Sequence, residues 1–333
     1  MRTWTVWLML GAALPASAAD GMRGPVSGFV VDGRSIRAIE GLPGAARLGA
    51  SLQLPFSVSA AAIAVRQDYA LATRSDGVGG PVLVRGLRAE TPDVLEIDNA
   101  IEASSVTIAP SGTVALLHSP TRRQLQFVTG LPAAPHALEP VDLSGIESIA
   151  VVAVDSDGAR AILGAADGQI YVAGQGTAPR AVATLRGVSS LAVLPEKDAA
   201  VASSVETGDL ILLEGLAGTP SIRTLGGIAN GLGPARAVRA LDSRTVGVIA
   251  ADGKLAALDI ESGSVEWIAL AGIAENFVPL DRNLFVLNRA GDQPLLLLDS
   301  SRGHSAWFVP PDRRPVQPRR PGQGGSGAAA RPQ

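Results

Sequence analysis

Two stretches near the carboxyl-terminal end of the chain repeat one another at an offset of 40 residues. The first, Gly253–Trp267, reads GKLAALDIESGSVEW, and the second, Pro294–Trp307, reads PLLLLDSSRGHSAW. Each contains an apolar strand, an acidic turn closed by glycine, and a second strand that carries a tryptophan. Self-similarity at a fixed period of about 20–50 residues is the signature of a repeat architecture. The equivalent positions are Asp259 and Asp299, Gly263 and Gly303, and Trp267 and Trp307.

A unit of four short strands can be followed from Val26 to about Pro310. The first strand ends in a first turn, the second ends in a second turn, and two further strands complete the unit. The first turns are Arg66–Asp68, Pro110–Gly112, Asp155–Gly158, Pro195–Asp198, Asp242–Arg244 and Asp281–Asn283. The second turns carry Asp-Gly or Gly-Asp, and glycine supplies the positive φ of tight hairpins. They are Asp76-Gly77, Asp167-Gly168, Gly208-Asp209, Asp252-Gly253 and Gly291-Asp292.

Four short strands in roughly 40 residues, repeated radially, are typical of a β-propeller blade. The sequence therefore predicts an all-β fold with a single β-propeller. Six full units follow Phe56, and a shorter unit spans Gly28–Leu54, so we expect seven blades. The first blade is expected to be incomplete, or completed by chain from the other terminus. Because closing the ring removes exposed sheet edges, the strands Phe29–Asp32 and Ser305–Val309 should lie in the same or neighbouring blades.

The two ends of the chain differ in composition from the repeats. Residues 1–19 have one basic residue, an apolar run and small residues near Ala18, which predicts a secretory signal peptide. The alternative is an amino-terminal membrane anchor, but the apolar run is shorter than a membrane span requires. Residues 20–310 would form the propeller. Residues 311–333 are rich in Pro, Gly and Arg, which predicts a disordered tail.

These features predict a bacterial protein that is periplasmic or secreted, with no transmembrane segment after signal cleavage. Arginine far outnumbers lysine, as is typical of bacteria with high-GC genomes. The basic tail could touch anionic lipid, peptidoglycan or nucleic acid, or it could be a solvated end; the second interpretation is favoured, and no nucleic-acid partner is expected. The chain has no cysteine, which excludes disulfides, thiolate metal sites and a cysteine nucleophile.

Ala257-x-Asp259-x-x-Ser262-Gly263-x-x-x-Trp267 resembles the tryptophan-docking repeat of pyrroloquinoline-quinone-like propellers, and residues 297–307 are a looser copy. The middle units, such as Val106–Gly130, look more like the YVTN or WD40-like bacterial repeat. The resemblance implies that the Asp-to-Gly turn joins the two outer strands of a blade. It also implies that Trp267 and Trp307 are largely buried against neighbouring blades. Quinone enzymes of that superfamily are larger, with eight blades, so no cofactor is expected here.

Catalytic motifs are not evident in the repeats. The three histidines lie in different units, and no Gly-x-Ser-x-Gly elbow is present. Asp155–Gly158 could be a calcium loop, but it lacks a downstream acidic ligand and stands where other units have a hairpin turn. We therefore interpret it as a turn, and assign no catalytic residue.

Polar residues recur in the loops that enter the first strand of a unit. Glu102, Glu147 and Glu275 could converge at one end of the channel and hold a divalent metal such as calcium. Such a pocket would loosely resemble that of propeller lactonases. Asn230, Arg236 and Asn276 are candidate binding residues at the same end. The alternative is that these side chains belong to the solvated mouth that any propeller has, and this interpretation is preferred.

The sequence thus favours an exported, non-catalytic β-propeller scaffold that binds a protein or polymer partner through its loops. The alternative function is a metal-dependent, lactonase-like hydrolase with its site at the channel mouth. Fold alone does not decide between them, since function depends on a site.

Overall fold

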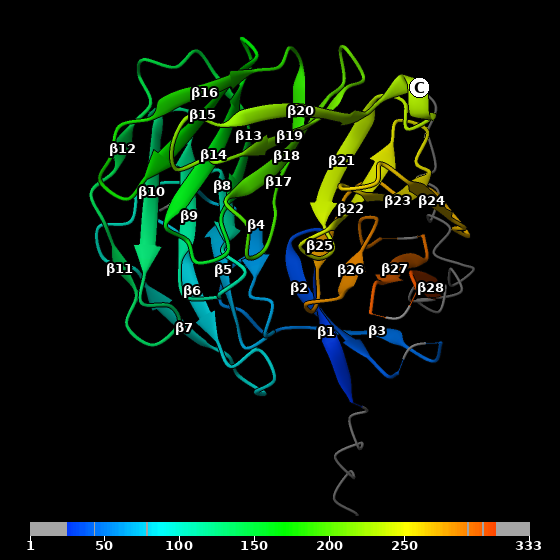
Figure 1. The fold of residues 1–333 in the computed structure, drawn as a ribbon. Coiled ribbons are helices and arrows are strands. Elements are labelled where there is room, and N and C mark those ends of the chain that lie inside the picture. Colours follow the sequence, from blue (N-terminus) through cyan, green and yellow to red (C-terminus); the bar gives the residue numbers. More distant parts are fainter. Residues whose placement is uncertain (1–24, 43, 78, 292, 302, 311–333) are drawn as a thin grey trace, which may run out of the picture.

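The computed structural model describes residues 25–310, apart from positions 43, 78, 292 and 302. It is an all-β propeller of seven blades (Figure 1), which confirms the predicted fold. The predicted signal peptide, residues 1–19, and the predicted tail, residues 311–333, lie outside the described residues. Within the described part of the chain, no helix is long and apolar enough to cross a membrane.

The blades follow one another in chain order, and neighbouring strands within each blade are antiparallel. Blade 1 contains β1 (Val26–Asp32), β2 (Ser35–Glu40) and β3 (Arg47–Ser51). Blade 2 contains β4 (Val58–Ile63), β5 (Tyr69–Arg74), β6 (Val82–Arg85) and β7 (Asp93–Glu96). Blade 3 contains β8 (Ser105–Ile108), β9 (Ala115–Ser119), β10 (Gln124–Thr129), β11 (His136–Ala137) and β12 (Val141–Asp142). Blade 4 contains β13 (Ile149–Val154), β14 (Arg160–Ala165), β15 (Gln169–Gly174) and β16 (Arg180–Thr184). Blade 5 contains β17 (Val188–Val193), β18 (Ala199–Ser204), β19 (Leu210–Glu214) and β20 (Ser221–Gly226). Blade 6 contains β21 (Ala235–Ala240), β22 (Thr245–Ala250), β23 (Leu255–Asp259) and β24 (Val265–Ile268). Blade 7 contains β25 (Val278–Pro279), β26 (Leu284–Val286), β27 (Leu295–Asp299) and β28 (Ser305–Val309). A short 3-10 turn, η1 (Ile228–Asn230), precedes β21.

The first strands of blades 2 to 6 lie beside one another around the centre of the ring. These strands, β4, β8, β13, β17 and β21, run in the same direction, so the connections fall at two ends. We call the end with the first turns the turn end; it also carries the turn between the third and fourth strands. The opposite end, with the second turns and the loops that enter each first strand, is the loop end.

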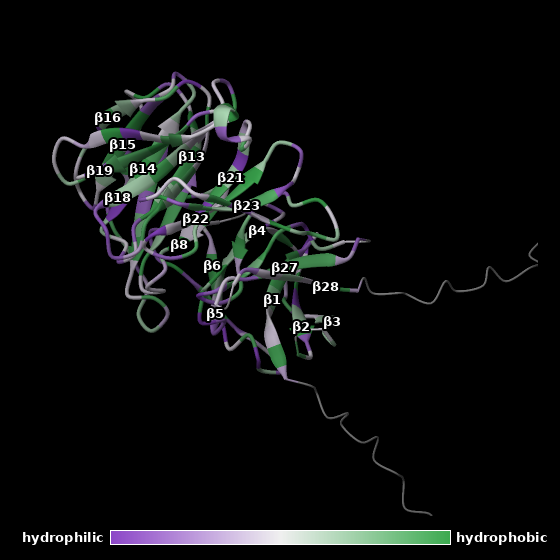
Figure 2. Cartoon of the chain, turned by 45° about the vertical axis from the view of Figure 1, so that its right-hand side comes forward, coloured by the Kyte–Doolittle hydropathy of each residue, from purple (hydrophilic) through white to green (hydrophobic). Residues whose placement is uncertain are grey.

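Apolar side chains of adjacent blades form the core. One cluster joins β18 and β19 of blade 5 to β22 and β23 of blade 6, and similar clusters fill the other interfaces. Figure 2 shows hydrophobic residues concentrated in the strands and many hydrophilic residues in the connections. Because each sheet is covered on both faces, its strands are apolar on both faces, and β5, β9 and β18 are buried along almost their whole length.

Blade 1 lacks the innermost strand among the described residues. Its β1–β2 hairpin turns at Asp32-Gly33, which matches the second turns of the other units. This hairpin lies at the loop end, since Arg34 contacts blade 2 there: the Val58 N–H donates to the Arg34 carbonyl at 2.9 Å, and Arg34 donates to Ser75 Oγ at 2.6 Å. Strands β1, β2 and β3 therefore correspond to the second, third and fourth strands of a blade. The prediction of an incomplete first blade agrees with this arrangement.

Packing of blade 1 against blades 7 and 2 closes the ring. Val30 of β1 and Val309 of β28 belong to one buried cluster, which confirms that the terminal strands lie in neighbouring blades. On the other side, the buried side chain of Gln67 accepts a hydrogen bond from the Phe29 N–H at 2.7 Å. The side-chain amide thus satisfies a buried backbone group on the unpaired edge of β1, where an inner strand would otherwise pair.

The repeat around Asp259 and Asp299 has the predicted turn but not the predicted tryptophan burial. Gly263 and Gly303 both have φ near 70°, and each aspartate accepts hydrogen bonds from the following turn residues. Trp307 is half-buried against the cluster between blades 1 and 7. Trp267, however, is 46% exposed, so the expectation that it is largely buried is wrong. Its indole lies beside Gly231, which has no side chain to pack against the ring.

Candidate functional site

A cavity of about 670 Å³ lies at the turn end of the central channel. Its walls are the ends of the inner strands and the first turns of blades 2 to 7, from Val65 to Phe285. The described residues of blade 1 contribute nothing to the wall, in keeping with the absence of an inner strand among them. The walls contain apolar side chains, such as Val154, Leu191 and Val193, and a few hydroxyl groups. The cavity is therefore at the opposite end of the channel from the site that the sequence predicts.

Arg239 is the only charged side chain that an inner strand contributes to this cavity within the described residues. It stands opposite Gly247 in the β21–β22 pair, on the face of the sheet that turns toward blade 7. A side chain at Gly247 would collide with the ring of Phe277, which fills that space. Burial lowers the pKa of Arg239, and no carboxylate offsets that effect. Across the part of the chain that is described, no hydrogen bond or ion pair engages its guanidinium.

The rim of the cavity is acidic. Glu196, Asp242 and Asp281 come from the first turns of blades 5, 6 and 7, together with Arg282. The carboxylate of Asp242 accepts hydrogen bonds from two backbone N–H groups of its own turn, and that of Asp281 accepts one. A guanidinium together with three carboxylates and one further arginine at the rim is an arrangement that can select ligands by charge.

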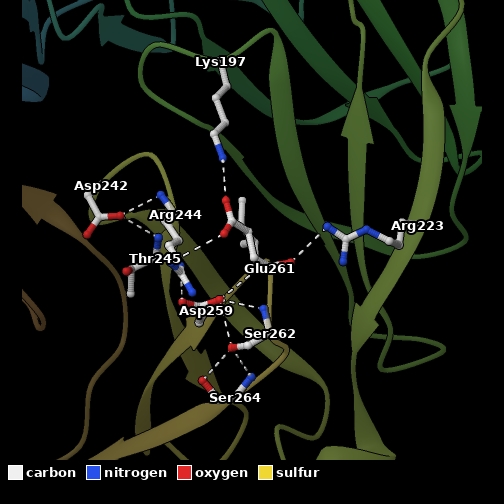
Figure 3. A network of polar contacts seen from close by, with 10 residues as sticks. Lys197, Arg223, Asp242, Arg244, Thr245, Asp259, Glu261, Ser262 and Ser264 are labelled. Atoms are coloured by element: carbon white, nitrogen blue, oxygen red, sulfur yellow. Dashed lines mark hydrogen bonds and ion pairs between the residues drawn. The ribbon is translucent and has the colours of Figure 1, made fainter.

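Polar contacts brace the turn end from blade to blade. Figure 3 shows the part around blade 6, where Arg244 of the first turn binds Asp259 and Glu261 of the outer turn. Lys197 of blade 5 approaches Glu261 at 3.8 Å, and Arg223 donates to the Ile260 carbonyl at 3.0 Å. Hydrogen bonds from Ser262 and Arg244 hold the pKa of Asp259 well below its usual range.

A second bridge joins blades 4 and 5. Arg160 lies 3.1 Å from Asp155 within its own blade and 2.6 Å from Asp198 in the next. Asp155 is buried, and burial raises the pKa of its carboxyl above the ordinary value. Asp155 therefore has a structural role, and its turn is a hairpin turn as the sequence predicts.

The structure places Glu102, Glu147 and Glu275 at the loop end, each in the loop before a first strand. It does not bring them together, since the described residues contain no group of three or more His, Cys, Asp or Glu side chains that could hold a metal ion. Glu102 is paired with Arg122 at 2.9 Å, and Glu275 is 3.9 Å from Arg289. All three are exposed. Their positions in the repeat place them at one end of the ring, but the carboxylates of Glu102 and Glu275 pair with separate arginines.

The three predicted binding residues also separate. Asn230 is exposed in η1, and Arg236 donates to the Ala251 carbonyl at 3.3 Å. Asn276 is different, because its Oδ1 is buried without a hydrogen-bond partner, alone in this respect among the described side chains. It is the only one of the predicted residues with an unsatisfied buried atom, which costs stability unless a donor reaches it.

The loop end also carries exposed apolar side chains on blades 5 and 6. We call Val205, Ile228, Trp267 and Ile273 the loop-end patch; they are 46–64% exposed. Three of them lie against glycines of the neighbouring loops: Ile228 covers Gly208 of the second turn of blade 5, Ile273 covers Gly253 of blade 6, and Trp267 lies beside Gly231. A depression of about 350 Å³ beside Trp267 continues to Leu270 and Gly272.

Sequence reasoning missed Arg239 and the patch. A signal for Arg239 was available, because β21 reads ARAVRA while β4, β8, β13, β17 and β25 contain no charged residue. No comparable signal in the sequence pointed to the loop-end patch, since exposed isoleucines are indistinguishable in sequence from buried ones.

No family model matches the chain, and no curated protein matches its sequence. Among solved structures, the chain is similar to the crystal structure of a functionally unknown protein from Desulfotomaculum acetoxidans, with a TM-score of 0.58 and 12% identity over 86% of this chain and 99% of that one. It is also similar to the crystal structure of RRP9 WD40 repeats, with a TM-score of 0.56 and 11% identity over 78% of this chain and 82% of that one. At these identities the likeness shows the fold alone: a seven-bladed propeller similar to WD40 repeats.

Proposed function

We propose that the protein is an exported, non-catalytic scaffold that binds a protein partner through the loop-end patch. The observation that carries the proposal is the exposure of Trp267 among three aliphatic residues on adjacent loops. Contiguous exposed apolar groups are uncommon on soluble monomers and mark interaction surfaces. Tryptophan is also enriched among the residues that contribute most to protein–protein binding.

A protein partner is favoured over a polymer. Val205, Ile228 and Ile273 are aliphatic, and they offer neither hydrogen bonds nor flat faces to a polysaccharide. An apolar surface on a second protein would cover them, with Asp252 and Lys254 at the edge of the depression as part of a polar rim.

Two further proposals accompany this one. The Asp-to-Gly turns of blades 6 and 7 support a relationship to the pyrroloquinoline-quinone-like and YVTN or WD40-like bacterial propellers, although the exposure of Trp267 counts against a full docking motif. The composition of residues 1–19 supports export to the periplasm or beyond.

Site-specific photo-crosslinking in the native host tests the binding proposal. A photoreactive phenylalanine analogue is introduced at Ile228 or at Ile273, both 64% exposed. Leu42, equally exposed at 64% but at the turn end of blade 1, is the matched control. We expect both loop-end positions to yield the same discrete crosslinked protein, and Leu42 to yield none.

The same experiment can reject the proposal. If neither loop-end position crosslinks a protein, or if Leu42 gives the same product, the patch is not a docking surface. A product that resists protease but yields to glycan-degrading enzymes would replace the protein partner with a polymer. In a positive result, Trp267→Ala should abolish the crosslink at Ile273.

A further inference from the structure

Arg239 holds a positive charge deep in the ring, and no residue of the described part of the chain pairs with it. Buried or partly buried charges in proteins are ordinarily paired, because removing an ion from water is costly. Other arginines at this end form ion pairs: Arg160 and Arg244 each contact two carboxylates. The nearest acidic residues along the chain offer Arg239 no ion pair, and Asp242 is instead bound to the backbone of its own turn. An anion that enters the channel would supply the missing partner.

The surroundings restrict which anion fits. The cavity volume of about 670 Å³ is in the range of small-molecule sites, and its walls include Val154, Leu191 and Phe285. A ligand with an apolar body is therefore favoured over a bare inorganic ion. Glu196, Asp242 and Asp281 at the rim would repel a second negative charge. Phosphate esters and polyanions are disfavoured for that reason, whereas a single carboxylate is not.

We propose that the turn-end cavity binds a small organic monocarboxylate, with its carboxylate on the guanidinium of Arg239 and its apolar body against the walls of blades 4, 5 and 7. Arginine suits this role because its planar fork of N–H donors matches the two oxygens of a carboxylate. Hydroxyl groups of Ser156 and Ser243 line the same cavity and are available to polar substituents of the ligand. The proposal is independent of the proposed docking function, since the two sites lie at opposite ends of the channel.

The test uses the purified chain with phenylacetate and hexanoate as probes, and their neutral amides and inorganic phosphate as comparison ligands. Binding is followed by calorimetry and by the NMR signal of the Arg239 side-chain N–H. We expect saturable binding of the carboxylates, at least tenfold weaker binding of the amides, and no competition by phosphate. Arg239→Met should weaken carboxylate binding at least tenfold. Arg289→Met makes the same charge change at the loop end, on a side chain that is 88% exposed, and should leave binding unchanged.

Thermal unfolding without ligand separates a binding residue from a structural one. A residue kept for a ligand is dispensable for folding, so the melting temperature of Arg239→Met should equal or exceed that of the wild type. The proposal is overturned if no carboxylate probe binds, if Arg239→Met binds the probes as the wild type does, or if phosphate binds more tightly than the carboxylates. It is also overturned if Arg239→Met unfolds at a clearly lower temperature, because the arginine would then be part of the fold.

Discussion

The two ends of the propeller differ in how their side chains are used. At the turn end, charged and polar groups reach from one blade to the next, as Arg160 does to Asp198 and Tyr69 does to Gly112. At the loop end, the carboxylates Glu102 and Glu275 pair locally, and apolar side chains stand exposed. The turn end thus carries charged bridges between blades around a cavity that contains Arg239, while at the loop end hydrogen bonds, such as that of Arg34 to Ser75, join the blades. The loop end has surface to offer a partner.

The largest expected effect is at the turn end, in Tyr69→Ala. The ring of Tyr69 is 1% exposed in the core between blades 2 and 3, and its hydroxyl donates to the Gly112 carbonyl at 2.9 Å. Loss of a large buried aromatic side chain costs about 3–5 kcal/mol of unfolding free energy. Tyr69→Phe keeps the ring and removes only the bridge, so about 1–2 kcal/mol is expected. Denaturant unfolding measures both losses: an unchanged stability of Tyr69→Phe would contradict the contribution of the bridge, and equal losses would contradict that of the ring.

A smaller loss is expected from Asp155→Ala, also at the turn end. The buried carboxylate accepts hydrogen bonds from the backbone N–H of Arg160 at 3.0 Å and from its Nε at 3.1 Å. Because Arg160 keeps Asp198 as a partner, the loss of unfolding free energy should be about 1–3 kcal/mol. Asp157→Ala, in the same turn but exposed, is the control and should cost less.

A double-mutant cycle sharpens this result. Arg160→Met and Asp155→Ala remove the same bridge, so their combined cost should be less than the sum of the single costs. Additive costs would mean that Arg160 stabilises the blade 4–5 contact through Asp198 alone.

Much of the fold could be predicted from local chemistry. Asp-Gly turns such as Asp252-Gly253 need glycine at positive φ, and Gly253 has φ 83°. The spacing of these turns gave the blades, their number and the ring closure. The same rule identifies Asp32-Gly33 as a second turn, so β1 corresponds to the second strand of the other blades.

The site was harder to predict, because loop direction is a tertiary property. The position within the repeat placed Glu102, Glu147 and Glu275 at one end of the ring, but it did not fix the direction of exposed side chains, and Glu102 and Glu275 pair with arginines of their own blades. The prediction that Trp267 is buried was wrong for a similar reason. The motif is the same in both copies, yet Trp307 lies against blade 1 while Trp267 lies beside Gly231, which provides little surface to cover it.

At the loop end, Trp267→Ala should cost less stability than Tyr69→Ala does. The indole is nearly half exposed, and the free energy of burial scales with the apolar area removed from water. We expect a loss of about 1–2 kcal/mol, roughly half that of a fully buried aromatic. A loss above that of Tyr69→Ala in the same denaturation experiment would show that the loop end contributes as much to ring stability as the turn end.

The smallest effect near neutral pH concerns His118 of β9, a buried histidine toward the loop end, which contrasts with Asp155 at the turn end. Burial lowers the pKa of His118, because a charged imidazolium loses its hydration there. The unfolded chain therefore takes up the proton at higher pH than the folded protein does. Stability from this group is fully present above the ordinary histidine pKa of about 6.5 and is lost as the pH falls through the lowered value.

Asp155 has the opposite linkage, since its raised pKa favours proton uptake by the folded protein, but this acts only in the acidic range near the ordinary aspartate pKa. Between pH about 7.5 and 5, the denaturation midpoint should therefore fall in the wild type and fall less in His118→Gln. Equal slopes in the two proteins would show that His118 is as well hydrated in the folded ring as in the unfolded chain.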